Sequence, residues 1–339
     1  MSGPGPDVTV GIAFGFEPET IAVFEAISPR LHLRVTDGTD QAAIDSVASE
    51  DLDGLIGRRL PSDRAKTPSL RWLQVLSAGV EHLVGEDTVW PGEIVLTNAR
   101  GAYATSIAQY TIAAILRVAE RMDRRREQQL TGRWPDGPED DLLGESVRGR
   151  TLLIIGYGGI GREIARLAAA HGMRVIAVKA NPSVHTDDGF RAPGTGDPDG
   201  LIPERIAGID ELREVAAEAD YVSVTLPLTA ASRGVVSREV LAALPGHAWL
   251  VSTGRGPVVD EAALADVLAA GSIGGAVLDV FGEEPLPESS PFWGLPNVVI
   301  TPHVSGASSR ELAGLVGENL RRFVAGEPLL NRVDPERGY

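Results

Sequence analysis

Cysteine is absent from the 339-residue chain. This excludes disulfide bridges, thiolate metal sites and a cysteine nucleophile, and we predict no metal site. Basic residues are few as well: 31 lysines and arginines stand against 47 aspartates and glutamates, which leaves a net charge of −16. Such a chain repels the phosphates of nucleic acids and of anionic membranes. We therefore predict no nucleic-acid or membrane partner, and an anionic substrate would need a local cationic site.

Long hydrophobic runs are also missing. The segment 107–119 is interrupted by Gln109, Thr111 and Arg117, and it is shorter than the roughly 18–20 residues that span a bilayer. The first residues, 1–6, lack the basic and apolar stretches of a signal peptide. We therefore expect a cytoplasmic protein. At roughly 100–200 residues per domain, the length predicts two domains.

Short apolar runs alternate with helical patterns along the first hundred residues. We interpret as strands the runs 8–14, 31–35, 52–56, 72–76 and 94–96, and as a helix the segment 18–27. Strands that alternate with helices form parallel sheets with crossover helices. The sequence therefore predicts an α/β fold.

A long helix is predicted from residue 103 to about residue 122, because Ile107, Tyr110, Ala114 and Ile115 recur at helical spacing. The basic run 121–126 is interpreted as the solvated end of that helix. A polar connection, 131–145, follows. Later strands are predicted directly before Gly156 and at 174–178, 221–226, 248–252 and 275–280, with a loop at 181–200.

The strongest single motif is the glycine-rich turn of residues 156–161, which follows a buried strand and opens a helix. A pyrophosphate needs free backbone N–H groups at a helix N-terminus. Gly156 permits the tight turn, Gly158 permits a close approach of the phosphates, and Gly161 permits the helix to pack on the strand. This strand–turn–helix context indicates a dinucleotide site.

The end of the next strand bears on which dinucleotide binds. Sites that prefer NAD carry Asp or Glu there, roughly 20 residues on, to accept from the ribose hydroxyl. This chain has Lys179 instead, and a lysine could pair with the 2′-phosphate of NADP. A solvated lysine at a strand end is the alternative. We expect NADP or NAD, with NADP slightly favoured.

Three later segments carry polar groups suited to hydride chemistry. Arg255 follows one predicted strand, Asp279 ends the next, and His303 follows a third buried run, with Glu283 and Glu284 between them. An arginine can bind a carboxylate with two parallel hydrogen bonds. A histidine can transfer a proton near neutral pH, and a neighbouring carboxylate would orient it.

The order and spacing of seven segments resemble the D-isomer-specific 2-hydroxyacid dehydrogenase family, and the resemblance spans nearly the whole chain. Its glyoxylate/hydroxypyruvate reductase-like members are the nearest type. The segments are 76–82, 97–101, 156–161, 226–229, 254–260, 278–285 and 301–303.

This resemblance implies roles for single residues. Arg255 would bind the substrate, His303 would be the general acid and base, and Glu284 rather than Glu283 would be its partner. Backbone N–H groups of Ser77, Ala78, Gly79 and Val80 would bind the substrate carboxylate. The implied cofactor-binding residues are Gly156, Tyr157, Gly158, Gly159, Ile160, Gly161, Lys179, Leu226, Pro227, Thr253, Gly254, Asp279 and His303.

The resemblance also implies an architecture of two Rossmann-like or flavodoxin-like domains with parallel sheets and a cleft between them. The substrate domain would comprise residues 1–98 and 298–339, and the dinucleotide-binding domain residues 99–297. Helices near 103–122 and 308–325 would cross between the domains. The family implies a homodimer formed through the dinucleotide-binding domain.

Two further departures from the family pattern concern residues outside the proposed chemistry. Gln109 stands where glutamate is frequent, and Ser252 stands where asparagine is frequent. The expected activity is hydride transfer between NAD(P)H and a small 2-oxo or 2-hydroxy acid, with D stereospecificity. Two alternatives stay open: a corepressor-like protein that senses NAD(P)H, and a reductase of an inorganic oxyanion.

The sequence leaves the acid itself and the physiological direction of the reaction open. The pocket would depend on residues 57–59, on the 77–80 loop and on a partner subunit. His82 follows that loop and is a further candidate for lining the cleft. The other histidines, His32, His171, His185 and His247, are interpreted as surface or structural residues.

Overall fold

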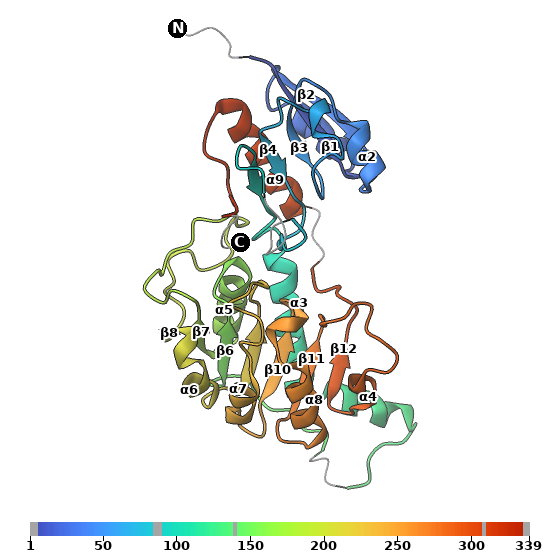
Figure 1. The fold of residues 1–339 in the computed structure, drawn as a ribbon. Helices are drawn as coiled ribbons and strands as arrows, with labels where there is room; N and C mark the ends of the chain where they lie inside the picture. Colours follow the sequence, from blue (N-terminus) through green and yellow to red (C-terminus); the bar gives the residue numbers. More distant parts are fainter. Residues whose placement is uncertain (1–5, 84–89, 138–140, 307–309, 335–339) are drawn as a thin grey trace. The chain divides into compact units, whose positions relative to one another are not determined.

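The computed structural model describes residues 6–83, 90–137, 141–306 and 310–334. The chain divides into two compact units, which are described separately. The first unit comprises Met1–Tyr103, Gly189–Ala192 and Ser308–Tyr339, and the second comprises Ala104–Asp188 and Pro193–Ala307. Both are α/β structures with parallel sheets (Figure 1), as the sequence predicted.

The first unit contains a five-stranded parallel sheet in the order β2-β1-β3-β4-β5. Its strands are β1 (Val8–Ala13), β2 (Leu31–Thr36), β3 (Leu52–Ile56), β4 (Trp72–Gln74) and β5 (Val95–Thr97). This is the flavodoxin-like order, in which the chain reverses direction across the sheet after β2. Ligands in such sheets bind outside the carboxyl ends of the strands.

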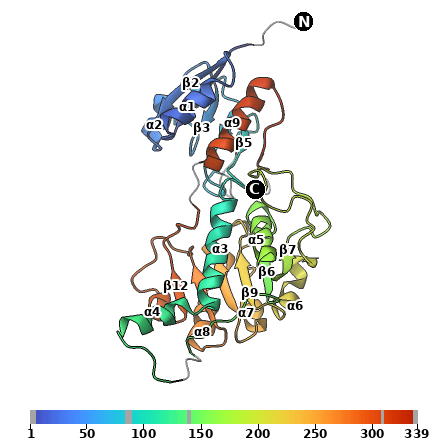
Figure 2. The same ribbon diagram turned by 180° about the vertical axis from the view of Figure 1, so that it is seen from behind.

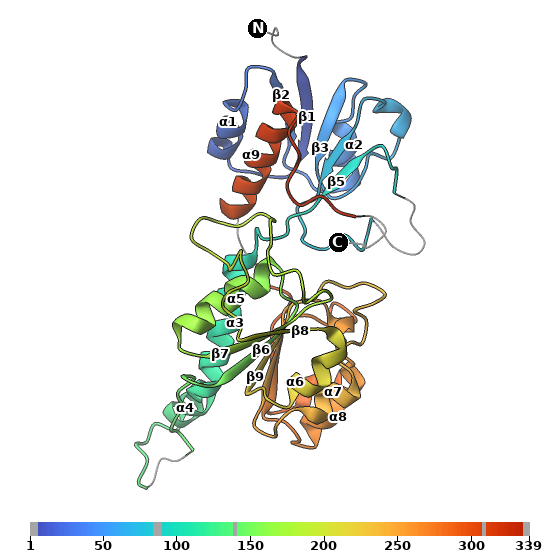
Figure 3. The ribbon, with the colours of Figure 1, turned by 90° about the vertical axis from the view of Figure 1, so that its left-hand side faces the viewer.

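Helices cover both faces of this sheet. The first helix, α1 (Pro18–Glu25), and the last, α9 (Arg310–Ala325), pack on one face, and α2 (Gln41–Ser46) packs on the other (Figure 3). A short 3-10 helix spans Arg64–Lys66. Helix α1 begins with Pro18, whose missing N–H costs nothing at that position. Helix α2 begins where the Asp40 carboxylate accepts from Ala43 N.

The second unit contains a seven-stranded parallel sheet in the order β12-β11-β10-β9-β6-β7-β8. Its strands are β6 (Thr151–Ile155), β7 (Arg174–Val178), β8 (Arg205–Ala207), β9 (Tyr221–Val224), β10 (Trp249–Ser252), β11 (Gly275–Leu278) and β12 (Val298–Ile300). The chain leaves β6 toward β7 and β8, then returns to β9 on the other side of β6. This reversal creates a crevice-forming switch point beside the carboxyl end of β6.

Helices α3 (Ala104–Ala119) and α5 (Gly159–Ala170) cover one face of this sheet (Figure 2). The other face is covered by α6 (Leu212–Ala216), α7 (Arg238–Ala243) and α8 (Glu261–Ala269). A further helix, α4 (Met122–Leu130), follows α3, and short 3-10 helices span Ile209–Glu211, Gly256–Val258 and Pro291–Gly294. Within the described residues, no helix is both long and apolar enough to span a membrane.

Three of the departures from the predicted elements concern α3, β8 and β12. The predicted helix 103–122 ends at Ala119, because Arg121 adopts a left-handed conformation with a φ of 48°, and most of the basic run lies in the separate helix α4. Strand β8 was not predicted, since its three residues show no alternation. The strand β12 pairs with β11 and therefore belongs to the second unit, whereas the predicted domain boundary assigned it to the terminal domain.

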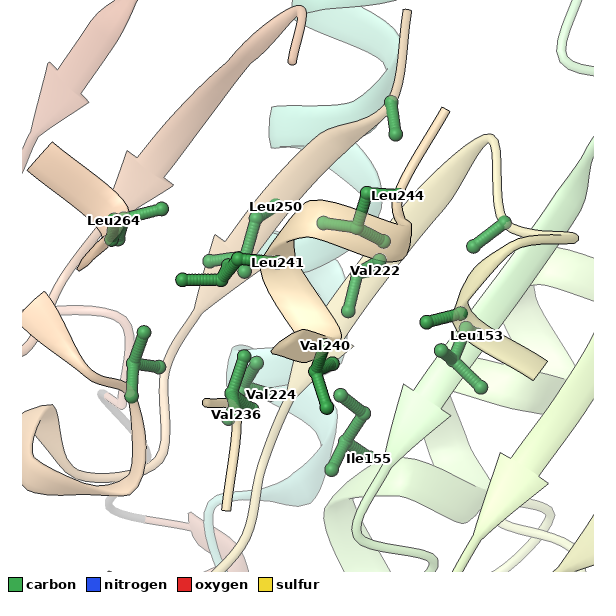
Figure 4. Packing of buried hydrophobic residues seen from close by; sticks show 14 of the residues in the cluster. Leu153, Ile155, Val222, Val224, Val236, Val240, Leu241, Leu244, Leu250 and Leu264 are labelled. Carbon is green, nitrogen blue, oxygen red and sulfur yellow. The ribbon is translucent and has the colours of Figure 1, made fainter. Parts of the chain in front are cut away.

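The core of the second unit shows why the strands before the loops read as continuous apolar runs. Leu153 and Ile155 of β6, Val222 of β9 and Leu250 of β10 point to the face that α7 covers (Figure 4). Alternate residues of the same strands point to α3 and α5. Both faces are buried, which is the usual environment of parallel strands.

We expect Leu153→Ala to lower the free energy of unfolding by about 2–5 kcal/mol, because it removes three heavy atoms from a fully buried position and leaves a cavity. Urea unfolding followed by circular dichroism would measure this loss. Leu201→Ala, at a leucine that is 79% exposed, is the matched control and should change stability by less than about 0.5 kcal/mol. Equal losses in both variants would contradict the packing described.

Candidate functional site

The glycine-rich turn connects β6 to α5 in the second unit. Gly156 has a φ of +108°, and a Cβ there would lie 2.9 Å from Leu226 N. A Cβ at Gly161 would lie 2.2 Å from Gly156 O, so only glycine permits this contact between helix and turn. A Cβ at Gly158 would meet nothing within 4 Å. The turn is thus tightly packed at Gly156 and Gly161 and open at Gly158.

The N-terminus of α5 and the neighbouring strand ends supply polar groups around this opening. No side chain caps the first turn of α5, which starts with Gly159 and Ile160. Thr225 Oγ1 donates to Gly156 O over 2.8 Å. The Oγ atoms of Ser252 and Thr253 are buried without a hydrogen-bond partner in the described part of the chain. Free helix N–H groups and unpaired buried hydroxyls fit a bound dinucleotide.

The loops after β9 and β10 approach the same turn. A Cβ at Gly254 would lie 2.7 Å from Leu226 O, so these two predicted cofactor residues are in direct contact. Pro227, next along the chain, is exposed. The structure thus brings Gly156, Leu226 and Gly254 together at the carboxyl ends of three adjacent strands.

A buried cluster beneath the turn was not found from the sequence. Tyr157 donates its hydroxyl proton to Asp197 Oδ2 over 2.5 Å, and the Arg162 guanidinium lies 4.7 Å from the centre of the Tyr157 ring. Arg162 also donates to the carbonyl oxygens of Asp197 and His185. Burial raises the pKa of Tyr157, so this phenol remains a donor. The cluster joins the 181–200 loop to the turn, and no local pattern reveals contacts between residues so far apart in sequence.

Lys179 directly follows β7, which pairs with β6. Its backbone N–H donates to Ala207 O, and its Nζ donates to Val184 O in the loop that follows. The side chain is therefore held by the 181–184 turn, where Asn181 Oδ1 accepts from Ser183 N over 3.2 Å. The lysine stands one residue beyond the strand end, at the position considered for the ribose.

Three neighbouring strands carry the remaining polar residues of the second unit. Arg255 follows β10, Asp279 follows β11 and His303 follows β12, so all three lie at the carboxyl edge of the sheet. Arg255 is partly buried, and its Nη1 donates to Gly254 O over 2.8 Å. The parallel register, rather than sequence spacing, brings these residues to one edge.

His303 and Glu284 are in direct contact. His303 Nδ1 lies 2.8 Å from Glu284 Oε2, and Glu284 Oε1 accepts from Phe281 N over 2.9 Å. The two side chains remain 47% and 36% exposed. In the tautomer that carries its proton on Nδ1, His303 donates to the Glu284 carboxyl group, and Nε2 is left for other partners. Glu283, the alternative weighed in the sequence, is exposed.

The turn that carries His303 is built around the Asp279 side chain. His303 has a φ of +55°, and its N–H donates to Asp279 O over 2.9 Å. Val304 N donates to Asp279 Oδ1 over 2.9 Å, and Ser305 N donates to Oδ2 over 3.0 Å. Burial alone would raise the pKa of Asp279, but hydrogen bonds from Ser305, Thr301 and Val304 outweigh it and lower the pKa. Asp279 is therefore a buried carboxylate that stays ionised.

The loop 77–80 belongs to the first unit and follows β4. Ser77 Oγ donates to Gly79 O over 2.7 Å, and Asn98 Nδ2 donates to Ala78 O over 3.0 Å. His82 Nε2 lies 3.0 Å from Arg58 O, which connects the loop to the turn after β3. Val80 is buried. The loop thus lies at the carboxyl edge of its own sheet.

The remaining histidines lie outside these sites. His171 Nδ1 lies 2.8 Å from Leu167 O at the end of α5, and His247 Nε2 lies 2.8 Å from Asp220 Oδ1. His32 lies near Asp7, and His185 contributes its carbonyl oxygen to the Arg162 cluster. Among the described residues, no three His, Asp or Glu side chains are grouped to hold a metal ion.

Residues 112–305 match the family model described as D-isomer specific 2-hydroxyacid dehydrogenase, NAD binding domain. A glyoxylate/hydroxypyruvate reductase B from Pectobacterium carotovorum is 31% identical over 90% of this chain and 92% of its own length. An (S)-sulfolactate dehydrogenase from Chromohalobacter salexigens is 31% identical over 76% of this chain and 79% of its own.

Solved structures agree with this match. The crystal structure of a D-isomer specific 2-hydroxyacid dehydrogenase from Xanthobacter autotrophicus, in complex with NADPH and MES, has a TM-score of 0.77 and 31% sequence identity. The match covers 99% of this chain and 100% of that chain. With its dinucleotide turn, its two parallel sheets and these relatives, the chain belongs to the D-isomer-specific 2-hydroxyacid dehydrogenase family.

Proposed function

We propose that the protein reduces a small 2-oxo acid to the D-2-hydroxy acid with NADPH. His303 acts as the general acid, and the positively charged Arg255 binds the substrate. The observation that carries the proposal is the 2.8 Å contact between His303 Nδ1 and Glu284 Oε2 at the sheet edge that also holds the glycine turn. The reductase and dehydrogenase names of the two relatives support a 2-oxo or 2-hydroxy acid as substrate.

The cofactor would supply the hydride when bound. Gly158 and the uncapped N-terminus of α5 would hold its pyrophosphate through backbone N–H groups. Thr253 Oγ1, which is buried without a partner among the described residues, would gain one there. We propose that Asp279 lies beside the nicotinamide at this edge of the sheet, where its carboxylate holds the turn that carries His303.

Proton transfer falls to the free nitrogen of His303. Because Glu284 accepts a hydrogen bond from Nδ1–H of the imidazolium, Nε2–H can give its proton to the substrate oxygen as negative charge develops on that oxygen. The Glu284 carboxylate stabilises the imidazolium form and limits rotation of the ring. In the reverse direction the neutral Nε2 accepts the hydroxyl proton.

Substrate binding requires a cation, because the chain as a whole is strongly acidic. Arg255 offers a planar guanidinium that can bind a carboxylate or a carbonyl oxygen. Within the described residues, the N–H groups of Ala78, Gly79 and Val80 donate to no protein acceptor. Such groups can bind a carboxylate, so we propose that the loop 77–80 binds the carboxylate of the substrate.

A preference for NADP is proposed from Lys179. The lysine is held at the end of β7 by the loop that follows, and its ammonium could pair with a 2′-phosphate. The NADPH complex of the related Xanthobacter protein supports this preference.

A homodimer through the dinucleotide-binding domain is proposed from the surface of α4 and the segment after it. Met122, Leu130, Trp134 and Leu143 are exposed there, and Trp134 is 84% exposed. A hollow of about 540 Å³ lies among Arg125, Gln129, Trp134 and Leu143. Exposed apolar side chains around a hollow are typical of a surface that another protein covers.

The reaction is tested by following absorbance of the reduced nicotinamide with NADPH or NADH and a panel of 2-oxo acids: glyoxylate, hydroxypyruvate, pyruvate, phenylpyruvate and branched acids. We expect turnover with at least one acid, giving the D product on a chiral column. Binding of NADPH without reduction of any acid would instead favour the NAD(P)H-sensing alternative.

In the active assay, His303→Ala should lower kcat by about 10²–10⁴-fold with unchanged cofactor affinity, because it removes the general acid.

Arg255→Ala should also raise the KM for the acid severely, because it removes the positive charge that binds the substrate. His32→Ala, at an exposed histidine of the first unit, is the control and should have the kcat and KM of the wild type. Unchanged turnover in either site variant would refute the role given to that residue.

Lys179→Ala should raise the KM for NADPH by about tenfold and leave the KM for NADH unchanged, because only NADPH carries the 2′-phosphate. Lys66→Ala is the matched control, since Lys66 is the only other lysine and lies in the first unit beside Asp63. A wild-type enzyme that prefers NADH would contradict the assignment.

Sedimentation analysis should give a mass twice that of the 35.8-kDa chain. Trp134→Glu should shift the protein toward monomer, because it introduces a charge into the proposed contact. Trp293→Glu changes another exposed tryptophan of the same unit, 55% exposed, and should leave the mass unchanged. A monomeric wild type would rule out the dimer.

A further inference from the structure

A chain of hydrogen bonds connects the helix α3 to Asp279. Tyr110 lies on α3, and its hydroxyl oxygen is 2.6 Å from Thr301 Oγ1, just beyond β12. Thr301 Oγ1 in turn lies 2.5 Å from Asp279 Oδ1. These three residues come from parts of the sequence that are separated by more than 20 positions from one another, so only the fold brings them into line.

The direction of the two hydrogen bonds follows from the charge of Asp279. Its pKa is lowered because the hydrogen bonds outweigh the effect of burial, so the carboxylate is ionised and can only accept. Thr301 must therefore use its one hydroxyl proton toward Asp279. The Thr301 oxygen is then an acceptor, and Tyr110 donates to it. Burial raises the pKa of Tyr110, which keeps the phenol protonated for this purpose.

The chain of hydrogen bonds ends at the backbone of His303. Asp279 O accepts from His303 N, and the Asp279 carboxylate accepts from the next two N–H groups. These contacts hold His303 in its left-handed conformation, which is uncommon for a residue with a Cβ. A shift of the Asp279 carboxylate would therefore move the His303 turn relative to Glu284.

We propose that Tyr110 is a positioning residue, which acts through Thr301 to fix the Asp279 carboxylate and the turn that carries His303. Tyr110 itself contacts neither Glu284 nor His303 in any described hydrogen bond. The inference concerns the proposed function and rests on the role given there to His303. It adds Tyr110 of α3 to the residues for which the family resemblance implied a role.

Few ionisable groups face Asp279 in the described residues. Tyr110 faces it from α3, and His303 lies on the turn after β12. Arg117, further along α3, acts on Tyr110 but is engaged by Asp123 in a bidentate contact. Removing a donor from the chain should therefore act on Asp279 mainly through lost hydrogen bonding, which raises the pKa of its carboxyl.

The test compares Tyr110→Phe, Thr301→Val and Thr301→Ser with the matched control Thr111→Val. Thr111, the next residue of α3, is fully buried, and its hydroxyl donates only to Ile107 O of its own helix over 2.9 Å. The first readout is the titration of the Asp279 side-chain carboxyl by ¹³C NMR in cofactor-free protein, with the signal assigned from Asp279→Asn. The second is the pH dependence of kcat for the acid that the wild type reduces.

We expect the pKa of Asp279 to rise in Thr301→Val and, to a smaller extent, in Tyr110→Phe, while Thr301→Ser restores it because the serine hydroxyl can still donate. The value of kcat should fall about three- to tenfold in Tyr110→Phe, the range expected for one neutral hydrogen bond. It should fall further in Thr301→Val, because the hydrogen bond lost there is made to an ionised carboxylate. The acid limb of the kcat profile should move to higher pH. Thr111→Val should change neither readout.

Two outcomes would overturn the inference: an Asp279 titration in Tyr110→Phe that matches Thr111→Val, or a loss in Thr301→Val that Thr301→Ser does not restore. The NMR readout needs no turnover, so it separates the two proposals. A protein that reduces no acid, yet shows the expected Asp279 shifts, would refute the proposed function and keep the hydrogen-bonded chain. An active enzyme without those shifts would support the proposed function and refute the positioning role of Tyr110.

Discussion

Parallel pairing of β9, β10, β11 and β12 on one side of β6 is the constraint on which the candidate site depends. Every strand of a parallel sheet runs in the same direction, so the residue after each strand emerges at the same edge. The glycine turn, Arg255, Asp279 and His303 follow β6, β10, β11 and β12 in this way. The reversal of strand order beside β6 leaves room at that edge for a ligand.

Hydrogen bonding to buried carboxylates decides the local electrostatics of the second unit. Asp279 is fully buried and still ionised, because several donors from the His303 turn and from Thr301 offset the cost of burial. The same balance applies to Asp197 beneath the glycine turn. Burial raises the pKa of Asp197, but hydrogen bonds from Tyr157, Ile202 and Leu201 outweigh burial, so the pKa is lowered. Each buried carboxylate thereby fixes a loop whose backbone it binds.

Membership of the family narrows the chemistry while leaving the substrate to the loops. The residues proposed for hydride transfer lie at the carboxyl edge of one sheet, and the loop 77–80 lies at the carboxyl edge of the other. Relatives of similar identity carry names that refer to different acids, glyoxylate or hydroxypyruvate in one and sulfolactate in another. Differences of this kind are expected when function resides in loops that one scaffold supports.

The sequence by itself determined the fold class, most strand positions, the glycine turn and the order of the motif segments, because these depend on local apolar runs and on residues with special backbone freedom. It did not predict the break at Arg121 or the three-residue strand β8, where local signals are weak. The sequence also assigned β12 to the terminal domain, because the pairing of β12 with β11 depends on residues far apart in the chain.

Only the tertiary structure decided which side chains meet. The 2.8 Å contact of His303 with Glu284 was named from a family resemblance, and spacing alone could not have given it. The contacts within the Tyr110–Thr301–Asp279 chain and the Tyr157–Arg162–Asp197 cluster could not be predicted from any local sequence pattern. The physical reason is that hydrogen bonds between distant residues depend on strand register and helix placement, which are set by the packing of the whole sheet.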